Sequence, residues 1–438
     1  MTETSTSGPR PLLISSTDLR GGAGRAALRI HQGLTQNGVE SRMNVLLKQS
    51  SDQAVISVYG SSGPAAYNLR AGLNRAPLLL YPQRYGDFSP QMVPGSRWKA
   101  GLAEGRGDRG FDLVHLNWVA SGFVGLRSLA RVRVPVVWTL HDMWAFTGGC
   151  HYDYGCGRYV ESCGACPLLG SGVDHDLSRL VWALKKSAWK NLDLTIVTPS
   201  RWLADCAANS SLLAGRRIEV IPNGLNLDQY RPVDQQDARR KLGLPEDARL
   251  VLFGAVAATS DERKGFAYLQ RALRQLGLRA GNRKVAVAVF GTSEAPAGWV
   301  DGDLQTFWLG DISNEEKLVQ AYAAADVFLA PSLQDNLPNT VVEAMACGTP
   351  TVAFDIGGMP DIIEHERTGY LAKRYDPDQL AAGLDWLLGA DRQLCREIRL
   401  RCRKRTAELF DLGTAAKRYV ALYESVLGNA RSGNRPAN

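Results

Sequence analysis

The chain has 438 residues, of which 45% are hydrophobic and 22% are charged, and its formal net charge is +7. This length predicts two domains of about 200 residues each, and the composition is typical of globular proteins. No stretch approaches the ~20 consecutive apolar residues of a membrane span, and the N-terminus has no basic region followed by an apolar run. We therefore expect a cytoplasmic protein. Its basic charge would favour peripheral contact with the anionic inner face of the membrane, but the lysines and arginines are spread widely, and ordinary solubilising charge is the alternative. No motif for nucleic-acid binding accompanies this charge.

The first half of the chain alternates continuous apolar runs with helical patterns. The runs predict strands at residues 11–15, 41–47, 111–119, 134–140 and 192–200. Strands that are buried on both faces of a parallel sheet have such runs. The pattern therefore predicts a doubly wound α/β domain over residues 11–215.

A glycine-rich turn follows the first expected strand. It contains Gly22 and Gly24 and fits G-x-G-x-x-A, a pattern found at dinucleotide sites. An NAD site also needs an acidic residue at the end of the second strand, where this chain has Lys48, with Asp52 several residues later. An NAD(P)-dependent oxidoreductase is therefore one alternative, and the other is that these glycines let a different phosphate-bearing ligand approach the backbone.

Polar residues stand at the ends of two further strands of this domain. His115 and Asn117 end the third run, and His141 and Asp142 directly follow the fourth, VPVVWTL. Ligands of open α/β sheets bind outside the carboxyl ends of the strands. We therefore expect all four residues to belong to a site, with His115, Asn117 and Asp142 on the acceptor side.

A cysteine-rich insertion occupies residues 148–170. Its four cysteines are Cys150, Cys156, Cys163 and Cys166. In a cytoplasmic protein such crowding favours thiolate ligation over disulfides, and a four-sulfur zinc site would order a loop that has few apolar residues of its own. Only one pair has C-x-x-C spacing, so free thiols or an iron–sulfur cluster are the alternatives to structural zinc.

The pattern changes at residues 216–232, where a strand gives way to Pro, Asn and Gly and then to a polar stretch, as in a linker. Further strands are expected at residues 250–256, 284–291, 306–310, 326–332 and 349–354. They predict a second doubly wound domain over residues 216–405. An amphipathic helix is expected over residues 406–428.

Two acidic residues of the second domain, Asp335 and Glu343, have seven residues between them. The loop and helix start between them could present backbone N–H groups to an anion; its residues are Asn336, Leu337, Pro338, Asn339 and Thr340. A carboxylate can bind ribose hydroxyls while helix-terminal amides and a nearby cation hold a diphosphate, which suits a nucleotide sugar. Arg263 and Lys264 are the expected cations. A capped surface helix gives the same pattern without a ligand.

The segment over residues 331–371 resembles the donor-binding signature of retaining glycosyltransferases of family 4, in which two glutamates flank a seven-residue spacer. The resemblance continues through Gly357, Gly358, Pro360, Asp361 and Gly369, and PNGLNLDQYRP resembles the family's interdomain connector. Asp335 and Asp361 stand where the family has glutamate. The stretches HDMWAFTGGCHY, GCGRY and CGACP resemble a subgroup that builds exopolysaccharides.

The resemblance implies the GT-B architecture, two Rossmann-like domains that face a cleft, with the terminal helix crossing back to the first domain. It implies retaining transfer of a sugar from a UDP-, GDP- or ADP-linked donor to a glycan or lipid-linked acceptor, with no cofactor required for catalysis. Glu343 would bind ribose, Asp335 and His141 would contact the donor sugar, and Lys264 with Arg263 would stabilise the leaving group. Because Asp335 is shorter than glutamate and an expected arginine after residue 254 is absent, a catalytically silent sugar-nucleotide-binding subunit is a further alternative.

Overall fold

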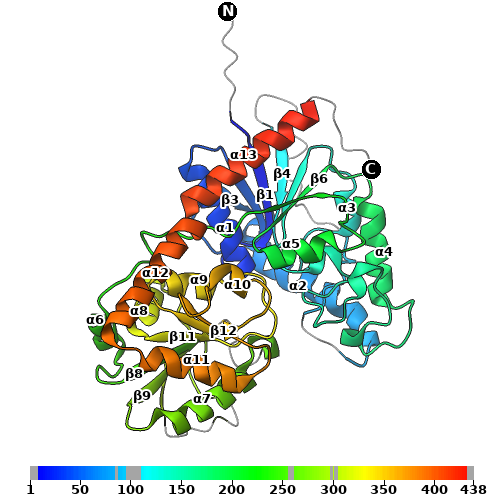
Figure 1. Cartoon of the computed structure of the whole chain (residues 1–438). Coiled ribbons are helices and arrows are strands. Elements are labelled where there is room, and N and C mark those ends of the chain that lie inside the picture. Colours follow the sequence, from blue (N-terminus) through cyan, green and yellow to red (C-terminus); the bar gives the residue numbers. More distant parts are fainter. Residues whose placement is uncertain are drawn as a thin grey trace, which may run out of the picture. The chain divides into compact units, whose positions relative to one another are not determined.

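The computed structural model describes residues 8–83, 87–94, 110–254, 261–295, 299 and 304–431. Contacts within the chain divide it into two units: unit 1 holds the chain up to Gly224 and again from Leu412, and unit 2 is Leu225–Asp411. Each unit is built on one parallel sheet with helices packed against it (Figure 1). The predicted class, α/β with two doubly wound sheets, is confirmed.

The described sheet of unit 1 has seven strands in the order β3-β2-β1-β4-β5-β6-β7. Their bounds are β1 (Pro11–Thr17), β2 (Arg42–Leu47), β3 (Val55–Ser57), β4 (Leu113–Leu116), β5 (Val136–Thr139), β6 (Leu194–Thr198) and β7 (Arg217–Val220). All neighbours pair in parallel. The strand order reverses between β1 and β4, so the carboxyl ends of β1, β4 and β5 lie next to the switch point where such sheets bind ligands.

The helices of unit 1 are α1 (Gly21–Gln36), α2 (Gly63–Arg75), α3 (Leu126–Leu129), α4 (Leu177–Trp189), α5 (Arg201–Ala208) and α13 (Leu412–Arg431). Short 3-10 turns are η1 (Gly60–Ser62), η2 (Ala76–Leu80), η4 (Trp144–Phe146), η5 (Arg158–Val160) and η6 (Pro167–Leu169). The terminal helix α13, red in Figure 1, packs against α1. A Cβ atom on Gly33 of α1 would lie 3.1 Å from Leu412, so a small residue lets the two helices approach closely.

The described sheet of unit 2 has six parallel strands in the order β10-β9-β8-β11-β12-β13. Their bounds are β8 (Arg249–Gly254), β9 (Val285–Phe290), β10 (Gln305–Trp308), β11 (Val327–Ala330), β12 (Thr351–Phe354) and β13 (Gly369–Ala372). Its helices are α6 (Gln235–Leu242), η7 (Glu262–Lys264), α7 (Phe266–Ala280), α8 (Glu315–Ala324), α9 (Asn339–Ala346), α10 (Met359–Ile362), α11 (Pro377–Gly389) and α12 (Arg392–Phe410).

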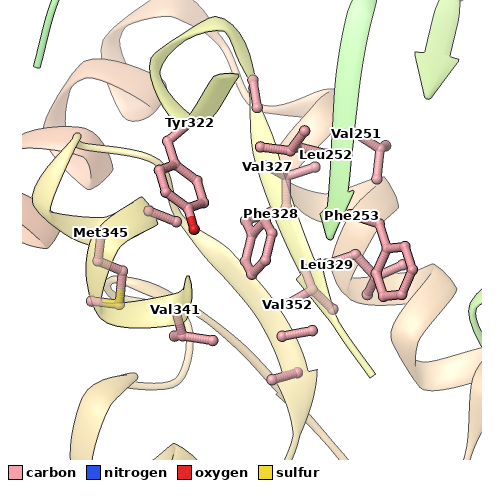
Figure 2. Packing of buried hydrophobic residues seen from close by; sticks show 14 of the residues in the cluster. Val251, Leu252, Phe253, Tyr322, Val327, Phe328, Leu329, Val341, Met345 and Val352 are labelled. Carbon is pink, nitrogen blue, oxygen red and sulfur yellow. The ribbon is translucent and has the colours of Figure 1, made fainter. Parts of the chain in front are cut away.

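The core of unit 2 lies between its sheet and the helices packed against it, which include α7, α8, α9 and α11. Figure 2 shows Tyr322 of α8 and Val341 and Met345 of α9 beside Phe328 of β11 and Val352 of β12. Burial of each such apolar side chain contributes about 1.5–3 kcal/mol to the free energy of unfolding. This packing fixes the loops that follow β8, β11 and β12, and these loops carry the predicted donor residues.

Within the terminal segment 406–428, the helical pattern of residues 412–427 is α13, which begins at Leu412 because the extended backbone of Asp411 separates it from α12. Other elements differ from the sequence-based expectations. The strands β3 and β13 were not predicted, since both are short and only partly buried. The cysteine-rich insertion contains short 3-10 turns. Within the described part of the chain, no helix is long and apolar enough to cross a membrane.

Candidate functional site

Three loops of unit 2 come together at the carboxyl edge of its sheet, because β8, β11 and β12 are neighbouring strands. The backbone N–H of Leu333, in the loop after β11, donates to the carbonyl of Arg263, in the turn after β8, at 2.8 Å. The N–H of Gly358, after β12, donates to the carbonyl of Asp335 at 3.2 Å. The loop after β11 is therefore held between the other two.

Two glycines make this close approach possible. A Cβ atom on Gly265 would lie 1.9 Å from the carbonyl oxygen of Pro331, and one on Gly357 would lie 1.9 Å from that of Asp335. Both glycines also have positive φ, +73° and +52°, a conformation that side chains other than hydrogen disfavour. The loops can therefore pack in this way only with glycine at both positions.

Arg263 and Lys264 share one carboxylate partner. Lys264 Nζ lies 2.7 Å and an Arg263 guanidinium nitrogen 3.2 Å from the same oxygen of Asp335. A second contact, 2.9 Å to Asp261, fixes the other end of the guanidinium. Burial raises the pKa of the Asp335 carboxyl, but the two cations outweigh burial and hold the pKa below its ordinary value. Asp335 is therefore ionised at neutral pH and keeps both cations in fixed positions.

The helix α9 begins directly after this cluster. Its N-cap residue is Pro338, which has no side-chain group that could bond the first-turn N–H groups. Asn336 and Leu337 are buried, whereas Asn339 and Thr340 in the first turn are partly exposed. The helix start is thus uncapped by its own N-cap side chain and lies within a few residues of two cations, an arrangement that favours an anion.

Glu343 lies in the second turn of α9 and is almost completely buried. One of its carboxylate oxygens accepts a hydrogen bond from the Tyr322 hydroxyl of α8 at 2.9 Å. Burial and the charge of Glu343 raise the pKa of Tyr322 well above its ordinary value, so the hydroxyl keeps its proton and donates. Tyr322 was not predicted from the sequence, because no pattern links a tyrosine of α8 to a carboxylate of α9.

Unit 1 has a hollow at the carboxyl ends of β4 and β5, lined by Asn117, His141, Asp142 and His151 among others. His141 Nε2 lies 3.2 Å from the side-chain oxygen of Asn117. The amide nitrogen of Asn117 is buried and has no hydrogen-bond partner among the described residues. Burial lowers the pKa of His141 to about 4, so the imidazole is neutral at pH 7. Beside the carboxylate of Asp142, the hollow therefore offers a neutral imidazole and one unused donor.

Asp142 belongs to a chain of hydrogen bonds that the sequence did not reveal. His151 Nδ1 lies 2.7 Å from the Asp142 carboxylate, and its Nε2 lies 3.0 Å from the hydroxyl of Ser89. Burial raises the pKa of Asp142, but His151 and the backbone N–H of Trp144 hold it below its ordinary value. His151 directly follows Cys150 in the sequence, and the structure places it in the hollow with Asp142.

His115 does not join this group. Its imidazole is 0% exposed and lies 2.8 Å from the Thr139 hydroxyl and 2.7 Å from the hydroxyl of Tyr423 on α13. Burial lowers its pKa to about 3. His115 thus has no exposed surface, and both of its ring nitrogens are bonded within the fold. It joins α13 to the sheet, and the expected acceptor contact is not supported.

Two family models match the chain on either side of the boundary between the units. The model described as Glycosyltransferase Family 4 matches residues 20–229, and the one described as Glycosyl transferases group 1 matches residues 248–390. Between them they include the hollow of unit 1 and the cation cluster of unit 2. The chain belongs to glycosyltransferase family 4.

This family 4 chain is similar over much of its length to proteins named D-inositol 3-phosphate glycosyltransferases. It is 27% identical to D-inositol 3-phosphate glycosyltransferase 2 of Catenulispora acidiphila over 303 residues, 65% of this chain and 64% of that protein. The same identity holds over 398 residues for D-inositol 3-phosphate glycosyltransferase of Mycolicibacterium gilvum, 87% of this chain and 80% of the relative. The match to the Catenulispora protein thus spans less than two thirds of that protein's length.

Solved structures share the fold. Sucrose-phosphate synthase of Thermosynechococcus elongatus superposes with a TM-score of 0.67 at 22% identity and covers 96% of this chain and 99% of its own. Anabaena HepE in complex with UDP and glucose has a TM-score of 0.62 at 18% identity, covering 95% of this chain and 100% of its own. At such identities the likeness establishes the fold alone, which is GT-B.

The glycine turn of this family 4 chain serves close packing. A Cβ atom on Gly24 would lie 2.6 Å from the Thr17 hydroxyl, so glycine lets α1 start next to the end of β1, and Gly22 precedes it in the first turn. The carboxylate of Asp18 accepts the N–H groups of Gln49 and Ser50 beyond β2. Lys48 follows β2 where an NAD site needs an acidic residue, as the sequence indicates, and family membership replaces the oxidoreductase alternative.

The cysteine-rich insertion is ordered by hydrogen bonds at its cysteines. Cys163 Sγ accepts the N–H of Gly148 at 3.0 Å, and the backbone N–H of Cys166 donates to the Asp176 carboxylate at 2.8 Å. Burial raises the pKa of Cys150, Cys163 and Cys166, so these thiols are protonated at neutral pH unless a metal binds them.

The described residues contain no group of three or more Cys, His, Asp or Glu side chains placed so that it could hold a metal ion. The arrangement of the four cysteines therefore does not by itself form a zinc ligand set, and structural zinc stays a prediction. Elemental analysis of the purified protein decides it: near-stoichiometric zinc supports the site, and metal-free protein with four titratable thiols in the insertion rejects it.

Proposed function

We propose that the chain is a retaining glycosyltransferase that moves a sugar from a nucleoside-diphosphate sugar to a hydroxyl of a glycan or lipid-linked acceptor in polysaccharide synthesis. The observation that carries this proposal is the pair of cations, Arg263 and Lys264, fixed by Asp335 beside the start of α9. A nucleoside diphosphate is the ligand whose charge and shape suit two fixed cations next to a helix N-terminus.

The cations act on the leaving group. In the proposed step, the bond between the sugar C1 and the diphosphate oxygen breaks, and its electron pair stays on the diphosphate. The acceptor oxygen bonds to C1 on the same face, and its proton passes to a diphosphate oxygen. Lys264 and Arg263 stabilise the charge that develops on the diphosphate, which is a major source of rate enhancement when the charges are preorganised.

Asp335 has a role that differs from the expected one. One of its carboxylate oxygens already pairs with both cations, so we assign it first to holding Arg263 and Lys264 and only then to contact with the sugar. Glu343, oriented by the Tyr322 hydroxyl, is proposed to accept hydrogen bonds from the ribose. The N–H groups around Asn339 and Thr340 are proposed to bind the diphosphate.

Unit 1 supplies the second set of proposed contacts. The neutral imidazole of His141 and the unpartnered amide nitrogen of Asn117 suit the hydroxyl groups of a sugar, which both donate and accept hydrogen bonds. Asp142, held by His151, is proposed to bind an acceptor hydroxyl. No metal or other cofactor is assigned to the transfer step, in line with the two protein cations next to α9.

UDP-sugars are the first donors to test, because the Anabaena neighbour was crystallised with UDP and with UDP-glucose. GDP- and ADP-sugars are the alternatives. A thermal-shift screen of all three classes should find one that raises the melting temperature, since a ligand that binds only the folded state stabilises it by mass action. The same donor should then be hydrolysed slowly or transferred.

Variants separate an enzyme from a silent subunit. We expect Lys264→Ala to lower turnover by about 10²–10³-fold. The matched control is Lys284→Ala, whose ammonium is 72% exposed and paired with Asp247 on the surface of the same unit. Wild-type protein that binds a nucleotide sugar but neither hydrolyses nor transfers it would favour the silent sugar-nucleotide-binding subunit. No binding of any of the three donor classes would contradict both functions.

A further inference from the structure

The helix α2 of unit 1 (light blue in Figure 1) buries the polar side chain of Asn74 and partly buries that of Arg70, beside the partly buried Ala66 and Tyr67. Asn74 is 3% exposed, and its side-chain oxygen accepts the N–H of Gln91 at 2.7 Å. Arg70 donates to the carbonyl of Gly122 at 2.7 Å and also to that of Pro94. Helices on a protein surface ordinarily bury their large apolar residues and expose their polar ones, whereas α2 buries Asn74 and exposes both of its leucines.

The outward face of α2 is apolar. Leu69 is 65% exposed and Leu73, four residues later on the same face, is 52% exposed. The following turn, η2, continues the surface, because Leu79 is 64% and Leu80 is 86% exposed. These four leucines are called the leucine patch below. Single exposed leucines are common, but four within twelve residues indicate a surface that meets an apolar environment.

The segment that carries the leucine patch has charge of one sign only. Residues 63–83 contain no aspartate or glutamate, whereas Arg75 stands exposed at the C-terminal end of α2. Exposed apolar side chains with basic residues and no acidic ones are the pattern of helices that lie in the interface of an anionic bilayer.

A bilayer suits this surface better than a protein does. A standard protein–protein interface buries about 800 Å² on each partner and uses about 20–30 residues a side, far more than four leucines provide. Partition into a bilayer needs only a few apolar side chains together with attraction to anionic headgroups.

We propose that the leucine patch binds the surface of an anionic membrane, with the four leucines at the acyl boundary and Arg75 at the headgroups. Binding of this kind requires no helix that crosses the bilayer. The proposal does not depend on the transfer chemistry, and it would place unit 1 where a lipid-linked acceptor is found.

Co-sedimentation of the full chain with phosphatidylcholine vesicles that contain about one third phosphatidylglycerol tests the proposal. We expect the double variant Leu79→Ser/Leu80→Ser to lower the partition coefficient by at least about tenfold, because two apolar side chains leave the bilayer. Arg75→Gln should weaken binding to these vesicles and leave binding to pure phosphatidylcholine unchanged.

The matched control is Leu278→Ser, a leucine of α7 in unit 2 that is 79% exposed. It should sediment as the wild type does. All altered side chains are exposed, so melting temperatures and donor hydrolysis should stay at wild-type values, which separates this test from that of the transferase function.

Three results would overturn the proposal. The first is a wild-type chain that stays in the supernatant with anionic vesicles, and the second is a double variant that sediments as strongly as the wild type. The third is a wild-type chain that forms dimers in solution while the double variant is monomeric, because the leucine patch would then be an interface between copies of the chain.

Discussion

The ammonium of Lys264 lies 2.7 Å from the carboxylate of Asp335. Lys264 lies in the turn after β8, and Asp335 lies in the loop after β11. The Asp335 side chain is only 9% exposed, and it also pairs with Arg263. Two cations gathered on one buried carboxylate cannot separate by repulsion, so the proposed diphosphate site is formed before a ligand arrives. Preorganisation of this kind lowers the free-energy cost of binding.

Asp335→Ala should therefore destabilise unit 2 as well as impair turnover. Removal of one partner leaves two poorly solvated cations next to each other, and the loss of a buried ion-pair partner costs about 3–5 kcal/mol. Urea unfolding with a probe in unit 2 measures the change. Asp247→Ala, which removes a carboxylate of an exposed ion pair in the same unit, is the control and should leave the unfolding free energy nearly unchanged. Equal effects of the two variants would contradict the holding role of Asp335.

Gly357→Ala should disrupt the same loop by sterics. The new Cβ atom would lie 1.9 Å from the Asp335 carbonyl oxygen, so Asp335, which holds both cations, must move. We expect a loss of more than about 4 kcal/mol of unfolding free energy or loss of nucleotide binding, both measurable on one sample.

Gly243→Ala is the matched control for Gly357→Ala, because it has a similar φ of +66° but nothing within 4 Å of the added atom. It should cost only the about 1–2 kcal/mol of a left-handed residue. If both variants lost the same free energy, the close contact at Gly357 would have no special importance.

Tyr322→Phe should weaken nucleotide binding without removing any group that touches the ligand. The variant removes the hydroxyl that donates to Glu343 and orients its carboxylate, and we expect affinity for the bound nucleotide to fall about 5–10-fold. Titration calorimetry with the donor found in the thermal-shift screen measures this. Tyr375→Phe alters a tyrosine that is 54% exposed in the same unit and should bind as the wild type does. If Tyr322→Phe bound the nucleotide with unchanged affinity, the proposal that Glu343, oriented by Tyr322, binds the ribose would be contradicted.

The sequence predicted the sheets and the donor loop because both have local signals. The strands β8, β9, β11 and β12 are continuous apolar runs, and the acidic residues Asp335 and Glu343 flank a helix start. The pairing of Asp335 with Lys264 joins positions 71 residues apart, and no local pattern encodes it. In the same way, the burial of His115 depends on Tyr423, 308 residues later on a helix that returns to unit 1.

The burial of His115 predicts how stability depends on pH. Its pKa falls from 6.5 in the unfolded chain to about 3 in the folded protein, so between these values the unfolded state binds one more proton. The free energy of unfolding must then fall as the pH falls below 6.5, by about 1.4 kcal/mol per pH unit and by about 2 kcal/mol at pH 5. His141, with a lowered pKa of about 4, adds a similar loss over its own interval.

His115→Gln removes the contribution of one histidine and leaves that of His141. The difference in unfolding free energy between the wild type and the variant should therefore be largest at pH 7. It should shrink by about 2 kcal/mol as the pH falls from 6.5 to 5. Urea unfolding at both pH values gives this difference directly, and the loss of packing is the same at each pH and cancels. Should the variant fail to fold, NMR titration of the wild-type imidazoles gives the same answer. An imidazole of His115 that titrated near pH 6.5 would show that it is not buried as described.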